Sequence, residues 1–129
     1  MSLPSEISIN TSLPTIDREQ LEMLLMADEG EDATGLVREI YELFRKESDE
    51  KLAKLDAICA ANDLLGLRNA VHFVAGSAGN LGMVRLNAFL RAIEEAVDKQ
   101  EINGAASLLA PIRSEYTTAC EAFEQELLA

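Results

Sequence analysis

Apolar residues recur every three or four positions along most of this chain, which is the spacing of amphipathic helices. The pattern is clearest over residues 64–81 and 84–99. Leu, Ala and Glu dominate the composition, and all three are compatible with helices. Over residues 17–128, period-two clusters of β-branched residues, which would indicate strands, do not occur. The pattern therefore predicts an all-α chain.

Turn and capping residues divide this pattern into five helices. Asp17, with Gln20 three positions later, resembles a capping box and opens the first helix. Gly30 is expected to end that helix. Pro111 should kink the last helix, because proline removes one backbone hydrogen bond. The helices are expected over about 17–30, 34–61, 64–81, 84–99 and 105–128.

The connections between the long helices are short, which makes consecutive helices antiparallel neighbours. We therefore expect an antiparallel up-down four-helix bundle with an additional short N-terminal helix. Residues 1–16 read as an N-terminal arm, and residues 17–129 as the helical bundle domain. The second helix shows bundle spacing at these apolar positions: Leu36, Val37, Ile40, Leu43, Phe44, Leu52, Leu55 and Ile58.

Charge and cysteine content exclude several classes of function. The 129 residues carry a net charge of −12, which argues against nucleic acid and anionic membranes as partners. Cys59 and Cys120 lie far apart and read as reduced, buried thiols of a cytoplasmic protein. One histidine and two distant cysteines do not make a recognised metal site. No secretory leader or membrane-spanning stretch is evident.

The single histidine, His72, lies on the polar side of the helix expected over 64–81. At about 100° per residue, His72 lies roughly 140° from the centre of the apolar stripe, so it should face solvent. Its neighbours on this face are Arg68, Ala75, Gly76 and Gly79. Each glycine costs a helix about 1 kcal/mol relative to alanine. We interpret the small residues as an open lane through which another protein's active site reaches the imidazole.

The run A-V-H-F-V-A-G-S-A-G-N-L-G at residues 70–82 resembles the signature of histidine-containing phosphotransfer (HPt) domains. In that family a helical histidine begins the motif H-x-x-K-G, followed by small residues, a hydrophobic residue and glycine. This chain departs from the motif at Ala75, where the family usually has lysine. The flanks also match, with Asn62-Asp63 before the histidine helix and Glu94-Glu95 after it. The resemblance covers roughly residues 17–126.

The resemblance implies that His72 accepts a phosphoryl group from the aspartate of a receiver domain and passes it on. The partners would be receiver domains of response regulators or hybrid histidine kinases. The receiver would supply Mg²⁺, whereas this chain would need no cofactor and has no kinase or ATP site. It would be a phosphoryl carrier rather than a classical enzyme. The oligomeric state stays open.

The charged residues expected around His72 bear on its proposed role. An exposed charge pair is worth about 0–1 kcal/mol, so the lysine missing at Ala75 should tune the chemistry and not abolish it. Arg68 is a candidate for part of that missing charge, with an ordinary solvated arginine an equal alternative. The resemblance puts a polar residue such as Glu94 near His72. The pattern alone favours a solvated carboxylate at the edge of its helix.

Two other functions remain open at this point. The first is a phosphate-free interaction module that docks receiver domains, which the missing lysine favours and the retained His72 and Gly76 oppose. The second is an unrelated structural bundle.

Overall fold

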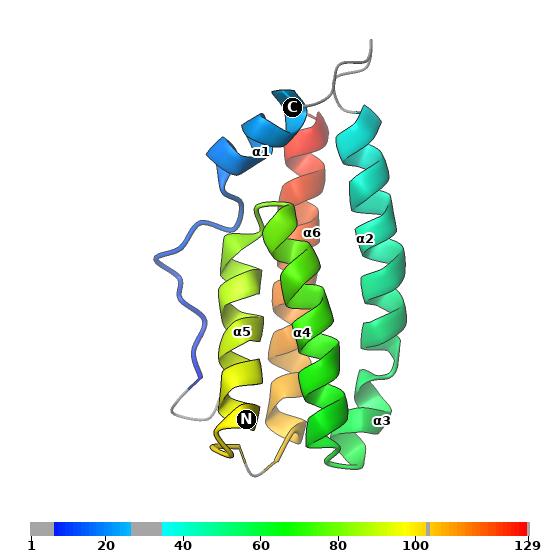
Figure 1. Cartoon of the computed structure of the whole chain (residues 1–129), viewed down its shortest axis with the longest axis vertical. Coiled ribbons are helices and arrows are strands. Elements are labelled where there is room, and N and C mark those ends of the chain that lie inside the picture. The colour runs from blue at the N-terminus through cyan, green and yellow to red at the C-terminus, as the bar shows by residue number, and fades with distance from the viewer. Residues whose placement is uncertain (1–6, 27–34, 103, 129) are drawn as a thin grey trace.

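A computed structural model describes residues 7–26, 35–102 and 104–128 of the chain, and no strand occurs in these ranges. Gly30 lies outside these ranges, so the predicted end of the first helix is not described. The elements, shown in Figure 1, are α1 (Arg18–Met26), α2 (Gly35–Ala53), α3 (Leu55–Ala60), α4 (Leu64–Asn80), α5 (Val84–Asp98), η1 (Ala106–Leu108) and α6 (Leu109–Leu128).

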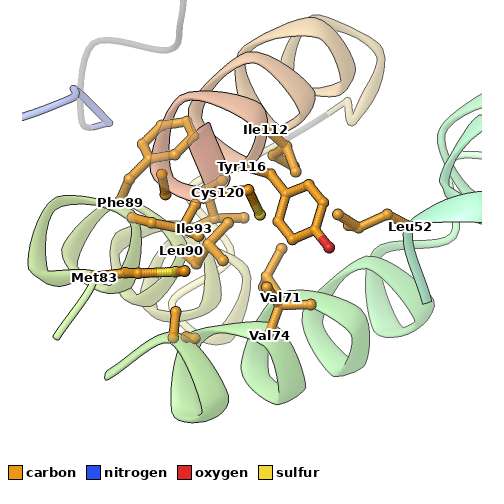
Figure 2. Close-up of a cluster of buried hydrophobic side chains, with 14 of the residues drawn as sticks. Leu52, Val71, Val74, Met83, Phe89, Leu90, Ile93, Ile112, Tyr116 and Cys120 are labelled. Carbon is orange, nitrogen blue, oxygen red and sulfur yellow. The ribbon is translucent and has the colours of Figure 1, made fainter. Parts of the chain in front are cut away.

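The long helices α2, α4, α5 and α6 run side by side, and α1 lies across one end of them (Figure 1). This confirms the predicted four-helix bundle with an additional short N-terminal helix. Its core holds side chains from every long helix, among which Figure 2 labels Leu52, Val71, Val74, Met83, Phe89, Leu90, Ile93, Ile112, Tyr116 and Cys120. Ile7 and Ile16, from the expected N-terminal arm, are also buried in this core.

The expected second helix is divided into α2 and α3 at Lys54. Lys54 keeps a right-handed helical backbone, with φ of −86° and ψ of −5°. The chain therefore passes from one helix to the next without the glycine or proline that would indicate a boundary. This is why the periodicity predicts one helix where the structure has two.

The face of α2 that packs on the bundle differs from the prediction. Buried residues on α2 are Val37, Tyr41, Phe44, Ser48 and Leu52. Leu36, Ile40 and Leu43, expected with the core, are exposed. The ring of Tyr41 stacks on Phe123 of α6 with 4.8 Å between centroids, and this contact is made on the buried side.

One expectation about helix ends is wrong, and a second holds only in part. Pro111 lies in the first turn of α6, after the 3₁₀ turn η1, and does not interrupt the helix interior. A first-turn residue has no intrahelical N–H bond to lose, so proline is tolerated there. Asp17 caps α1 by accepting from the backbone N–H of Gln20, but Gln20 does not reach back. Its amide donates instead to the carbonyl of Gly79, at 2.6 Å.

The α4–α5 hairpin positions the site, and it is fixed at both ends of α4. The carboxylate of Asp63 caps the N-terminus by accepting from the N–H of Gly66 at 2.9 Å. Gly82 makes the turn into α5 with a φ of +78°, as predicted for a tight turn. The carbonyl of Gly82 accepts from the N–H of Asp17 at 2.7 Å, which attaches the start of α1 to the turn.

None of the helices in the described ranges has the length and apolar character needed to cross a membrane.

Candidate functional site

His72 lies on the face of α4 that the sequence predicted. Its side chain is 56% exposed. The predicted apolar stripe on the other side of the helix is buried, and it consists of Leu67, Val71, Val74, Ala78 and Leu81. The periodicity of α4 therefore suffices to orient the imidazole toward solvent, beside the neighbouring helix α5.

Glu94 of α5 contacts the imidazole directly. Its Oε2 atom lies 2.5 Å from Nδ1 of His72. The Glu94 side chain is only 11% exposed, so the expected solvated carboxylate is wrong. An ionised carboxylate only accepts hydrogen bonds, which means that Nδ1 is the donor. In the neutral ring this places the proton on Nδ1 and leaves the lone pair on Nε2 free.

Two arginines hold the carboxylate of Glu94. Arg91 Nη1 donates to Oε1 at 3.1 Å, and Arg68 Nη2 lies 3.3 Å from Oε2. Burial raises the pKa of Glu94, but the hydrogen bonds from Arg91 and His72 and the nearby positive charges outweigh burial and lower the pKa overall. The carboxylate is therefore ionised at neutral pH, as the assigned tautomer of His72 requires.

Arg68, one candidate for the missing positive charge, is engaged with a second carboxylate. Its Nε donates to Asp98 Oδ1 at 2.8 Å, and its Nη2 to Oδ2 at 3.5 Å. Arg68 thus bridges Asp98 and Glu94 across α4 and α5. This arrangement brings Arg68 into the site as a residue that holds Glu94, with its own charge already paired.

Arg91 is a residue of the site that the sequence interpretation missed. Its Nη1 lies 3.3 Å from Nδ1 of His72. Because Nδ1 carries a proton and a guanidinium has no acceptor, this is a close approach and not a hydrogen bond. The available signal was its position three residues before Glu94, where the two side chains share one face of the helix.

The two glycines near His72 differ in how much space surrounds them. A Cβ on Gly79 would lie 3.0 Å from the side-chain amide of Asn87, so this glycine makes room for α5 of the same chain. A Cβ on Gly76 would meet only Arg91 Nη2, at 3.9 Å, which is an ordinary contact. The predicted lane of small residues is therefore open at Gly76, while Asn87 fills it at Gly79.

Ala75 does not lie on the exposed face. It is 0% exposed, and its carbonyl accepts from the Asn87 amide at 2.7 Å. The helical wheel put Ala75 beside His72 at the edge of the polar side, but a wheel contains no neighbouring helix. α5 covers this edge, so the position at which the family has lysine is enclosed between α4 and α5.

The chain matches the Hpt domain, the histidine-containing phosphotransfer domain, over residues 39–127, which is more than half of its length. The chain belongs to the HPt family. A solved HPt structure, histidine-containing phosphotransfer protein B (HptB) from Pseudomonas aeruginosa PAO1, is similar, with 26% sequence identity and a TM-score of 0.73. The similarity covers 89% of this chain and 96% of HptB. No curated protein sequence matches the chain. The matched HPt region contains α4 and α5, and with them every residue of the site.

Proposed function

We propose that this HPt domain is a phosphorelay intermediate that accepts a phosphoryl group on Nε2 of His72 and passes it on. The contact between Glu94 and Nδ1 carries the proposal. It favours the neutral tautomer whose Nε2 is nucleophilic, on a side chain that is 56% exposed.

The donor would be the acyl phosphate of a receiver-domain aspartate. Nε2 attacks phosphorus, the bond between phosphorus and the aspartyl oxygen breaks, and the leaving carboxylate takes the electron pair. The ring keeps its Nδ1 proton and becomes positively charged, which the Glu94 carboxylate offsets. Return transfer to a second receiver is the same step in reverse.

The partner would supply most of the remaining chemistry. Receiver domains of response regulators or hybrid histidine kinases would bring the aspartate and the Mg²⁺ ion, and this chain would bring the histidine and a docking face. We propose the cytoplasm as the place of this exchange, which the two free, buried cysteines support.

Phosphoryl transfer from labelled receiver domains tests the proposal. Receivers from the same organism are phosphorylated, incubated with the wild-type chain and with His72→Gln, and separated on gels. We expect label on the wild-type chain and none above background on His72→Gln, because glutamine has no nucleophilic nitrogen. A chain that binds a receiver without taking label would contradict the relay and support the phosphate-free docking module.

A further inference from the structure

The site lacks a cation at the position where the family usually has one. Position 75 holds alanine, which is 0% exposed and whose carbonyl accepts from Asn87 of α5. The resemblance gives the lysine of that position a role in offsetting phosphoryl charge. A site with Glu94 against the ring would otherwise place a phosphoryl dianion close to a carboxylate, which is unfavourable.

Arg91 brings a guanidinium to this part of the site from the neighbouring helix. Its Nη1 lies 3.3 Å from His72 Nδ1, and its Nη2 lies 3.9 Å from where a Cβ on Gly76 would be. It therefore lies beside both residues that the motif places around the missing lysine. Its side chain is 45% exposed, so an incoming group can reach it.

Arg68 and Arg91 contact different sets of carboxylates, and this difference indicates different roles. Arg68 makes two hydrogen bonds to Asp98 and also contacts Glu94. Arg91 contacts Glu94 alone among the acidic residues in the described part of the chain. Arg91 is therefore the arginine whose remaining N–H groups are free of a second carboxylate, and a guanidinium fork matches phosphoryl oxygens well.

We propose that Arg91 is the residue that stabilises the phosphoryl group on His72, supplying from α5 the charge that the family motif supplies from position 75. This inference rests on the proposed phosphoacceptor role of His72. It assigns Arg68 to positioning, because Arg68 acts through Glu94 and Asp98.

Phosphorylation by potassium phosphoramidate tests the role of Arg91 without any partner protein. In this reaction the P–N bond of phosphoramidate breaks, ammonia leaves with the bonding electron pair, and the Nε2 lone pair forms the bond to phosphorus. The rate is followed by intact-protein mass spectrometry. Arg91→Gln should be slower by roughly three- to tenfold, as expected for loss of one partly exposed charge contact. Arg91→Lys, which keeps the charge, should recover most of the rate.

Arg113→Gln is the matched control. Arg113 is 42% exposed and also pairs with a carboxylate, Asp56, on another part of the bundle. Its loss should leave the phosphorylation rate unchanged. Equal rates for Arg91→Gln and Arg113→Gln would overturn the proposal.

A double-mutant cycle with Glu94→Gln separates a direct role of Arg91 from an indirect one. A direct role predicts that Arg91→Gln still slows the reaction when residue 94 is glutamine. A loss that disappears in this background would mean that Arg91 only holds Glu94, and would overturn the proposal. Wild-type chain that takes no phosphoryl group at all would overturn the phosphoacceptor role itself, whereas labelling independent of Arg91 overturns this inference alone.

Discussion

Replacing Glu94 by glutamine is expected to slow phosphorylation of His72 by roughly 10- to 100-fold, the range found when metal-binding histidines lose the partner that orients them. Glutamine has nearly the same shape but no charge, so it cannot offset the positive ring that forms when Nε2 attacks phosphorus. The measurement is the initial rate with phosphoramidate. Glu95→Gln is the control, because Glu95 is exposed and pairs with Lys99 outside the site. A rate equal to wild type for Glu94→Gln would contradict the role of Glu94.

The stability difference between wild type and Glu94→Gln is expected to depend on pH. The pKa of Glu94 is lowered in the folded state, so the carboxylate stabilises the fold above its unfolded pKa of about 4.3. That contribution is lost as the pH falls through the lower folded pKa. The difference in unfolding free energy between wild type and Glu94→Gln, measured in urea, should therefore shrink on acidification below about pH 4.3. A difference that grows in acid would contradict the sign of the shift.

Restoring the family lysine by Ala75→Lys is expected to destabilise this chain, by about 1–3 kcal/mol, the usual range for overpacking a filled core position. The Ala75 side chain is 0% exposed, and Arg91 lies over the adjacent Gly76. A lysine chain would have to displace α5 or compete with the Arg91 guanidinium. Urea unfolding measures the change. Ala57→Lys, at an exposed position of α3, is the control and should change stability by less than about 0.5 kcal/mol.

Coupling between positions 75 and 91 sharpens this prediction. If Arg91 occupies the space a lysine needs, the double variant Ala75→Lys with Arg91→Ala should lose less stability than the sum of the single variants. Simple additivity, or an Ala75→Lys chain as stable as wild type, would contradict the enclosed position of residue 75.

The sequence was enough to predict the buried face of a helix whose apolar residues form a single narrow stripe. The apolar stripe of α4 is narrow, so its periodicity oriented His72 correctly and the HPt motif could be found. In α2 apolar residues occupy a wider arc, and only packing against the neighbouring helices α4 and α6 selects Tyr41 and Phe44 over Ile40 and Leu43. A periodicity cannot make that selection, because it contains no information about which neighbour covers which side.

The remaining parts of the site depend on contacts between helices. Glu94 and Arg91 reach His72 only because α5 packs against α4, and the same packing covers Ala75. Gln20 lies 59 residues from Gly79 in sequence, yet their hydrogen bond attaches α1 to the end of α4. These pairs have no local signature, except that Arg91 and Glu94 share one face of their helix.

The nitrogen-15 spectrum of the imidazole tests the central claim most directly. His72 is the only histidine, so a long-range proton–nitrogen spectrum of the labelled chain reports on this ring alone. The arrangement predicts one tautomer, with the proton on Nδ1, and after phosphoramidate treatment a phosphorus coupling on Nε2. A proton on Nε2, or a phosphoryl group on Nδ1, would contradict the proposed role of Glu94 and His72.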